Sequence, residues 1–317
     1  MRILTTLACR VVKKINIMLK FIDIGANLSD SVFRGNYHGK QAHEDDLINI
    51  INRSKKHGVE KIIVTGGSLK DSQKALDITK FDDSLYCTVG CHPTRSLEFE
   101  NDGQDPDVYL QDLISLANDN RDKVVAVGEM GLDFDRLHFA PKDAQIKYFE
   151  KQMELISATK LPVFFHCRAA HSEFLSVVSK HRDNIPGGVV HSFTGTKEEA
   201  ASILDLGFYI GINGCSLKSQ ENLDVMCSIP SENLMIETDC PYCEIRSTHA
   251  GFKYITTHFD SKKKEKYDPN CCVKSRNEPC TIVQVLEVMS GARKEDKHQL
   301  ADILYNNTIN LFFKGRN

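Results

Sequence analysis

The sequence predicts one α/β domain, a (β/α)8 TIM barrel whose functional site lies at the C-terminal ends of the strands. Short apolar runs rich in β-branched residues recur along the chain, and a longer segment with helical spacing follows each of them. Regular alternation of strand and helix is typical of a parallel sheet. Eight strand–helix units of roughly 37 residues each suit a closed barrel. An open doubly wound sheet is the alternative, but it requires a reversal of strand order of which the sequence shows no sign.

The expected strands are apolar runs that end in glycine, polar or charged residues. In chain order they are Phe21–Ala26, Lys61–Gly66, Leu85–Cys91, Val124–Glu129, Pro162–His166, Gly188–His191, Phe208–Asn213 and Leu234–Thr238. The segments after them have apolar residues at helical spacing. The expected helices are Asp46–Lys56, Leu69–Lys80, Asp107–Ala117, Asp143–Thr159, Ala170–His181, Lys197–Leu206, Ser219–Cys227, Ile282–Ala292 and Lys297–Phe312. The longest irregular stretch, Pro241–Pro279, follows the eighth strand, and loops of this length are usually functional or mobile.

Composition excludes several classes of protein. The chain has 41% hydrophobic residues and 19 glycines, the share of a globular protein rather than a disordered or fibrous one. Forty Lys and Arg stand against 43 Asp and Glu, a net charge of −3, so no overall positive field draws the chain to nucleic acid. Any nucleic-acid contact must therefore be local. Because no run of about 18 apolar residues occurs, we expect a soluble protein without a membrane partner.

Cysteine usage and the N-terminus bear on location. The chain has eleven cysteines, an odd number, and several of them stand singly in apolar stretches, which suits a reducing compartment; these are Cys87, Cys91, Cys167, Cys215 and Cys227. We expect residence in the nucleus, the cytoplasm or both. Residues 1–17 are basic, with no acid before Asp23, so a mitochondrial transit peptide is the alternative. We divide the chain into an extension at 1–18, disordered or cleaved, a barrel domain at 19–313 and a tail at 314–317; Met1 or Met18 begins the mature chain.

Side chains that can bind metal or move protons stand at the ends of the expected strands. They are Asp23, His92, Glu129, His166, His191 and Asp239. In a barrel these ends meet at one mouth, and carboxylates gathered there need a cation to offset their repulsion. Imidazole nitrogen together with carboxylate oxygen suits Zn²⁺ or Mn²⁺, whereas a Ca²⁺ site is normally all oxygen. A single histidine at a strand end can equally be a hydrogen-bonded core residue, but their coincidence favours a divalent-metal site.

Eight segments carry a resemblance to a known family. In order they are Phe21–Asn27, Thr65–Gly67, Val89–Pro93, Gly128–Phe134, Pro162–Arg168, His191–Gly195, Ile236–Pro241 and Arg276–Pro279. They resemble the signature motifs of the TatD-type metal-dependent deoxyribonucleases, in the amidohydrolase superfamily, and are most similar to the eukaryotic branch of that family. The resemblance covers residues 19–313. It implies that the protein hydrolyses DNA phosphodiester bonds. The implied activity is that of a 3′–5′ exonuclease, with endonuclease activity as a second one.

The resemblance also implies which residues bind metal. One or two divalent ions, Mg²⁺, Mn²⁺ or Zn²⁺, would be held by Glu129, His166, His191 and Asp239, with Glu129 reaching both ions. The first strand departs from the family pattern, because Gly25 and Asn27 stand where many relatives have the two histidines of H-x-H. An outer ion would therefore be held mainly by carboxylates.

Catalytic roles follow from the chemistry of phosphodiester hydrolysis. A divalent ion acidifies bound water and neutralises the phosphate oxygens. Glu129 then serves as a ligand, and Asp239 as a ligand or as the acceptor of the water proton. His92 is a candidate to hydrogen-bond phosphate or assist the leaving group. Its structural alternative is a ring packed beside Pro93.

Basic residues near the mouth are candidates for phosphate contacts. Arg168 and Arg276 are forked donors suited to phosphate, or they pair with Asp133 and Glu278 instead. The run Lys262–Lys266 touches the DNA backbone or, more often for such runs, is a solvated loop. We expect weak, sequence-independent and salt-sensitive DNA binding by a monomer.

Two other interpretations are open. Cys240-Pro-Tyr-Cys243 has the C-x-x-C pattern of a redox or zinc-binding pair, but an irregular stretch rather than a helix follows it. Cys271 and Cys272 are adjacent in the sequence and indicate no further site. Another barrel hydrolase, acting on an amide, lactone or phosphotriester, would usually have the first-strand H-x-H and a lysine on the fourth strand, where this chain has Asn27 and Glu129. A non-catalytic binding module is disfavoured by the four intact metal positions.

Overall fold

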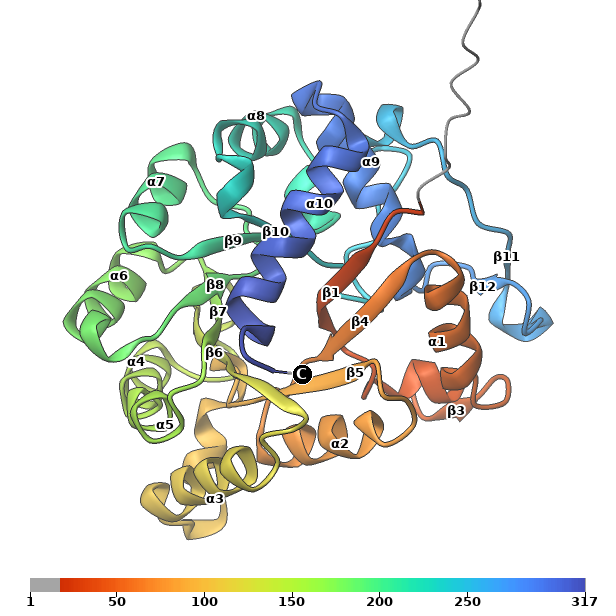
Figure 1. The fold of residues 1–317 in the computed structure, drawn as a ribbon. Coiled ribbons are helices and arrows are strands. Elements are labelled where there is room, and N and C mark those ends of the chain that lie inside the picture. The colour runs from red at the N-terminus through yellow and green to blue at the C-terminus, as the bar shows by residue number, and fades with distance from the viewer. Residues whose placement is uncertain (1–17, 317) are drawn as a thin grey trace, which may run out of the picture.

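Eight parallel strands form one sheet in the order β1-β4-β5-β6-β7-β8-β9-β10. The computed structural model describes residues 18–316. Two backbone hydrogen bonds join the end of the last strand to the first: Asp239 N donates to Gly25 O, and Asn27 N donates to Cys240 O, both over 2.8 Å. The sheet is thereby nearly closed, with helices around it (Figure 1), and the predicted (β/α)8 barrel is confirmed.

The strands differ from the expected ones mainly at their ends. The barrel strands are β1 Phe21–Ala26, β4 Val59–Val64, β5 Leu85–Val89, β6 Val124–Asp133, β7 Val163–Arg168, β8 Gly188–Val190, β9 Tyr209–Ile212 and β10 Leu234–Ile236. Two small pairs of strands lie outside the barrel: β2 Asn36–Tyr37 with β3 Lys40–Gln41, and β11 Ser261–Lys262 with β12 Cys272–Val273.

Helices follow the strands as the spacing predicts. The α-helices are α1 Leu47–Lys56, α2 Leu69–Thr79, α3 Pro106–Asp119, α4 Lys142–Lys151, α5 Met153–Thr159, α6 His171–Lys180, α7 Lys197–Asp205, α8 Gln220–Ser228, α9 Ile282–Arg293 and α10 Lys297–Thr308. A π-turn at Ile309–Phe313 extends α10. Short 3-10 turns complete the connections: η1 Ser31–Arg34, η2 Pro93–Phe99, η3 Asn101–Gly103, η4 Phe134–Arg136, η5 Arg182–Asn184, η6 Cys215–Leu217, η7 Ser231–Asn233, η8 Ala250–Tyr254, η9 Lys264–Lys266 and η10 Pro279–Thr281.

Side-chain caps explain where several helices begin. Thr196 and Ser219 each accept a hydrogen bond from the backbone of the third helical residue, and that residue's side chain accepts one in return, which makes two capping boxes. Ser68 accepts from Asp71 N at the start of α2. Each cap satisfies an N–H group that has no partner inside the helix.

The single helix expected over Asp143–Thr159 is two helices, α4 and α5, separated at Gln152. Gln152 Oε1 accepts from Cys91 N over 2.8 Å, and its Nε2 donates to Cys91 O over 3.0 Å. This buried amide joins the helix break to the segment that leads to His92.

Apolar side chains fill two regions. The larger lies between the barrel and its helices. The smaller fills the barrel interior, where Ile22, Ile24, Val125 and Phe164 pack with Phe312 and Phe313 in one cluster. Figure 1 shows α10 crossing the barrel and the C-terminus lying over its centre. The C-terminal segment therefore packs into the barrel at the end opposite the strand C-termini, which remain the open rim.

Residues 1–17 and Asn317 lie outside the described residues, and so does the transit peptide that the sequence analysis kept as an alternative. Within residues 18–316, no helix combines the length and the apolar character that a bilayer crossing requires. The long stretch after β10, expected to be irregular, contains three 3-10 turns and the pair β11–β12.

Candidate metal centre

Glu129 owes its position to an irregularity in β6. The pairing with β7 passes from Gly128 opposite Phe164 to Met130 opposite Phe165, so Glu129 has no partner residue across the ladder. A Cβ at Gly128 would lie 2.2 Å from Phe164 O, and its φ is +124°, so this position requires glycine. The extra residue at the bulge carries the Glu129 carboxylate to the open end of the barrel.

Glu129 meets two imidazoles at the ends of the next two strands. Its Oε1 lies 2.7 Å from His166 Nδ1 and 2.7 Å from His191 Nε2, and the two nitrogens are 3.3 Å apart. Metal–nitrogen bonds of about 2.0–2.1 Å in a tetrahedral site place ligand atoms roughly 3.3 Å from one another. The three donors are already gathered at nearly that spacing.

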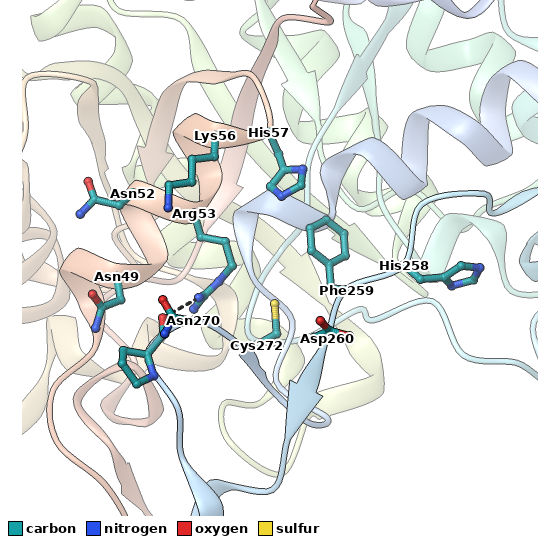
Figure 2. A pocket seen from close by; sticks show the side chains of 11 residues that line it. Asn49, Asn52, Arg53, Lys56, His57, His258, Phe259, Asp260, Asn270 and Cys272 are labelled. Carbon is teal, nitrogen blue, oxygen red and sulfur yellow. Dashed lines mark hydrogen bonds between the residues drawn. The ribbon is translucent and has the colours of Figure 1, made fainter.

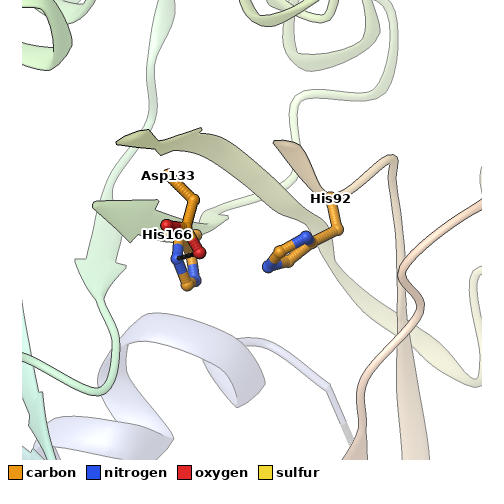
Figure 3. A group of neighbouring side chains, drawn as sticks. All are labelled: His92, Asp133 and His166. Carbon is orange, nitrogen blue, oxygen red and sulfur yellow. Dashed lines mark ion pairs between the residues drawn. The ribbon is translucent and has the colours of Figure 1, made fainter. Parts of the chain in front are cut away.

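His166 also belongs to a second donor group, with His92 and Asp133. On its other side, His166 Nε2 lies 3.3 Å from Asp133 Oδ2, at the end of β6. Figure 3 shows His92 reaching from its own loop toward Asp133 and His166, which stand on neighbouring strands. The two donor groups therefore share one imidazole, which as a neutral ring can bind an ion through only one of its nitrogens.

Hydrogen bonding settles the tautomer of neutral His92. Its Nδ1 accepts from Thr94 N over 3.1 Å, at the start of η2. Burial lowers the pKa of His92, which favours the neutral ring. Nε2 must then carry the hydrogen. That nitrogen lies 3.3 Å from Glu129 Oε1, so His92 presents an N–H group to the site.

Asp239 lies beside these donors rather than among them. Its Oδ1 accepts from Asn27 Nδ2 over 2.8 Å, and its Oδ2 accepts from the Cys243 thiol over 3.3 Å. Burial raises the pKa of Asp239 to about 6; the positive charge of His191 opposes this rise, and the negative charge of Glu237 adds to it. The structure thus brings Glu129, His166 and His191 into one tight group and leaves Asp239 at its edge.

Glu237 occupies the space that a first-strand side chain would fill. A Cβ at Gly25 would lie 2.6 Å from Glu237 Oε2. The same carboxylate lies 3.4 Å from His191 Nδ1, and its Oε1 accepts from Ser192 N over 2.5 Å. Gly25 therefore makes room for Glu237, a carboxylate that orients the ring of His191.

Proton affinities at the centre are strongly coupled. Burial favours the protonated acid, but the imidazoles of His191 and His92 outweigh it and hold the pKa of Glu129 well below its usual range. Burial likewise favours neutral imidazole, but the carboxylates of Glu129 and Glu237 hold the pKa of His191 well above its usual range. In the metal-free chain, protonated His191 thus supplies the positive charge that offsets the carboxylates, and a bound divalent ion would supply that charge in its place.

The donor set fits a divalent ion. Four buried side-chain atoms of the described centre form two close pairs: His166 Nε2 lies 3.3 Å from Asp133 Oδ2, and His191 Nδ1 lies 3.4 Å from Glu237 Oε2. Each carboxylate can orient the imidazole that it faces, which leaves the other nitrogen of that ring to bind an ion. Imidazole nitrogen and carboxylate oxygen facing one space are the donors that Zn²⁺ and Mn²⁺ accept.

The two arginines predicted to bind phosphate differ in their surroundings. Arg168 Nε lies 3.1 Å from Asp133 Oδ1, and the side chain is about one-third exposed at the rim. Arg276 lies in the interior instead: its guanidinium is buried and makes two hydrogen bonds to Asp46 and one to Glu278. Glu278 was one of the partners that the sequence analysis allowed for it.

A cavity of about 520 Å³ lies among the loops that follow β7 and β8 and the start of α8. Arg168, Phe193, Gly195 and Lys197 line it. None of Glu129, His166 and His191 lines this cavity, and its link to the metal centre is Arg168, whose Nε lies 3.1 Å from Asp133 Oδ1.

A second hollow, of about 360 Å³, lies on the flank between α1 and the loop before β12. Figure 2 shows Arg53 and His57 facing Phe259 and Cys272 across it. None of the predicted site residues lines this hollow.

Beside that hollow, Cys272, Glu278 and Cys280 form another group of donors. Glu278 is already paired with Arg53 over 2.8 Å and with Arg276 over 3.0 Å. Two guanidinium groups at this carboxylate disfavour a cation there.

The sequence analysis assigned no role at the metal centre to Asp133 or Glu237. Both stand inside motifs quoted for the family resemblance, Gly128–Phe134 and Ile236–Pro241, but Asp133 was considered only as a partner of Arg168. A signal was available for each. Asp133 lies four residues after Glu129, and Glu237 lies two residues before Asp239, close to the C-terminal ends of strands.

Comparison with known proteins identifies the relatives of this chain. Residues 22–313 match the family model described as TatD related DNase. The chain is 43% identical over 301 residues to the deoxyribonuclease Tat-D of Schizosaccharomyces pombe, covering 93% of this chain and 96% of that one. It is 33% identical over 293 residues to the 3′–5′ ssDNA/RNA exonuclease TatD of Citrobacter rodentium, covering 92% and 97%.

A solved structure shares the fold. The crystal structure of a hydrolase of the TatD family from Entamoeba histolytica superposes with a TM-score of 0.88 at 42% sequence identity, covering 93% of this chain and 98% of that one.

Proposed function

The chain belongs to the TatD-related DNase family, and on that premise we propose how this enzyme hydrolyses DNA phosphodiester bonds with the donors at the barrel mouth. One observation carries the proposal: Glu129 Oε1, His166 Nδ1 and His191 Nε2 lie within 3.3 Å of one another at the open rim. A bound divalent ion would lower the pKa of a coordinated water and neutralise the phosphate oxygens. Mg²⁺, Mn²⁺ and Zn²⁺ all suit the donors.

Glu129, His166 and His191 would hold the ion, and Asp239 would complete the ligand set or accept the proton of the attacking water. A carboxylate with a pKa near 6 is suited to accept a proton close to neutral pH. Asn27 and Cys243 hold its two oxygens by hydrogen bonds. If a second ion binds, Asp133 is its nearest additional donor, because Nε2 of neutral His92 carries a hydrogen.

His92 is the proposed donor to the substrate. Its Nε2–H group points to the carboxylate that the ion would engage, so a phosphate placed there would receive a hydrogen bond. A neutral ring donates without adding a charge to the crowded centre. The alternative of a ring packed only against Pro93 leaves this N–H group unexplained.

The rim provides contacts for a single strand. Arg168 and Lys197, which line the cavity among the loops after β7 and β8, are the proposed phosphate contacts. Tyr242, after β10, is 56% exposed, and its hydroxyl donates to Asp30 over 2.7 Å, which fixes the ring in place. An exposed, anchored aromatic ring can stack a base without sequence preference. The Lys262–Lys266 run contributes less, because Lys262 pairs with Asp268 and Lys264 lies over the ring of Tyr37.

We propose 3′–5′ exonuclease activity on single strands as the main reaction, with weak and sequence-independent binding by a monomer in the nucleus or cytoplasm. The bacterial relative named as a 3′–5′ ssDNA/RNA exonuclease supports the direction and the single-stranded substrate. The net charge of −3 supports weak binding. We further propose that residues 19–313 are the whole catalytic domain.

A substrate panel tests the proposal. The purified chain is incubated with a 5′-labelled single-stranded oligonucleotide, its 3′-blocked counterpart, a dihydropyrimidine and an aryl phosphotriester, with Mg²⁺, Mn²⁺ or Zn²⁺ in turn. We expect stepwise shortening of the free 3′ end only. Glu129→Gln should abolish the reaction, whereas Glu232→Gln, at an exposed position before β10, should not. Hydrolysis of the amide or the triester in place of DNA would overturn it.

A further inference from the structure

The C-x-x-C pair of the sequence is divided in the structure. Cys240 is fully buried, whereas Cys243 is partly exposed. The sulfur that contacts Cys243 Sγ belongs to Cys215, 28 positions earlier in the chain, at 2.8 Å. Cys215 is also partly exposed. The thiol pair at the rim is therefore Cys215 with Cys243, which the sequence alone did not indicate.

The backbone holds these two thiols together. Cys215 begins η6 after β9, and its N–H donates to Asn213 Oδ1 over 2.9 Å. The preceding Gly214 packs so closely that a Cβ there would lie 1.9 Å from Cys243 O. The two chain segments are thus in direct backbone contact. Their sulfur atoms approach because the loops are fixed, not because two flexible side chains happen to meet.

We propose that Cys215 and Cys243 are a redox modification site, forming a reversible disulfide when a peroxide oxidises them. The sulfurs need to move together by less than about 1 Å to reach the bond length of about 2.05 Å. One thiol is oxidised by hydrogen peroxide to a sulfenic acid, breaking the O–O bond and releasing one water. The other thiol attacks that sulfur, forms the S–S bond and releases a second water.

Reduction reverses the change. A dithiol exchanges with the disulfide through a mixed disulfide, becomes a disulfide itself and leaves two protein thiols. The chemistry therefore requires only a peroxide and a dithiol, both small enough to approach partly exposed sulfurs.

Oxidation changes the surroundings of Asp239. The Cys243 thiol donates its hydrogen to Asp239 Oδ2 over 3.3 Å, and a disulfide sulfur has no hydrogen to donate. Asp239 then keeps the hydrogen bond from Asn27 alone. Loss of a group that orients a metal ligand typically weakens metal binding by about 10-fold or more. This consequence rests on the proposed role of Asp239, whereas formation of the disulfide does not.

Mass spectrometry tests the bond itself. The full chain, reduced and freed of metal with a chelator, is treated with equimolar hydrogen peroxide, alkylated with N-ethylmaleimide and digested without reductant. We expect a peptide that links Cys215 to Cys243, lost on treatment with dithiothreitol. The Cys215→Ser variant should lack it, and Cys227→Ser, which removes an exposed cysteine on α8, should retain it. A Cys240–Cys243 link, or sulfinic acid without a cross-link, would overturn the proposal.

Metal titration tests the consequence. We expect the oxidised chain to bind Mn²⁺ about 10-fold more weakly by calorimetry, with recovery after reduction. Cys243→Ala, which lacks a donor, should mimic the oxidised form while still reduced. Cys215→Ser, which keeps the Cys243 thiol but cannot cross-link to it, should bind like the reduced chain and should not respond to peroxide. Equal affinity in the oxidised and reduced chains would refute the coupling to Asp239.

The two readouts separate this inference from the proposed function. The disulfide peptide is detected without substrate or metal, so a chain with no nuclease activity could still form it. A chain that hydrolyses DNA but never forms the cross-link would refute only the redox site.

Discussion

Asn27 Nδ2 donates a hydrogen bond to Asp239 Oδ1 over 2.8 Å, joining the end of the first strand to the end of the last. The Asn27 amide has no imidazole nitrogen to offer a metal ion, but it orients the carboxylate that stands beside the ion-binding group. At this position the first strand therefore contributes a supporting residue.

Replacing Asn27 tests this supporting role. Asn27→Ala removes the donor to Oδ1 and should weaken Mn²⁺ binding by about 10-fold, because Asp239 loses one of its two orienting hydrogen bonds. Calorimetric titration measures the change. Asn52→Ala, on the exposed face of α1, is the matched control and should leave the affinity as it is. An Asn27→Ala chain with normal affinity would show that the bond to Asp239 does not support the site.

Glu237 is predicted to act through His191. Glu237→Gln keeps the shape of the side chain but removes the charge that faces His191 Nδ1 at 3.4 Å. We expect metal affinity to fall by about 10- to 100-fold. Because the pKa of His191 is held up partly by this carboxylate, its titration, followed by NMR in the metal-free chain, should move to lower pH. If the titration of His191 and the metal affinity are both unchanged, Glu237 does not act through His191.

Tyr242 is predicted to stack a base. Tyr242→Ala should raise KM for a single-stranded oligonucleotide roughly 10-fold, in line with about 1–3 kcal/mol for stacking one base on an aromatic ring. Tyr242→Phe retains the ring and should retain most of the affinity. Hydrolysis of bis(p-nitrophenyl) phosphate, which offers no nucleobase, should be unaffected in both variants. If KM for this small ester rises as much as that for DNA, Tyr242 shapes the centre rather than binding bases.

Asp23 is predicted to make stability depend on pH. Burial raises the pKa of Asp23 to about 7, against about 3.9 in an unfolded chain. Between these values the folded chain binds more protons than the unfolded one, so this group's contribution to the free energy of unfolding falls as pH rises from about 4 to 7. Asp23→Asn should therefore gain stability relative to the parent chain as pH rises.

Urea unfolding of the metal-free chain at pH 5, 6, 7 and 8 measures this difference. The exposed variant Asp302→Asn serves as the control and should follow the parent chain at every pH. Parallel curves for Asp23→Asn and the parent would mean that Asp23 is ionised throughout the range.

The barrel could be predicted because its pattern is local. A short apolar run in the sequence indicates each strand. Because the strands are parallel and follow one another in sequence order, His166 and His191 lie at the same rim. The bulge that carries Glu129 could not be predicted in the same way, since it arises from the register between β6 and β7. The helix break at Gln152 has a similar origin, in contacts with a distant backbone.

The partners of reactive side chains were the hardest feature to predict. Arg276 has the chemistry of a phosphate ligand, but Asp46, more than two hundred positions away, meets it in the folded chain. Cys243 likewise finds Cys215 rather than the nearby Cys240. A sequence motif identifies the reactive groups, whereas the partners of those groups lie on neighbouring strands and loops that the motif does not contain.

The most direct test of the account is a crystal structure of the chain with Mn²⁺, measured at a wavelength where manganese scatters anomalously. We expect an anomalous peak within about 2.0–2.3 Å of ligand atoms of Glu129, His166 and His191 at the open end of the barrel. That peak should disappear in Glu129→Gln crystals. A peak elsewhere in the molecule, or one that persists in the variant with the same ligands, would contradict the central claim.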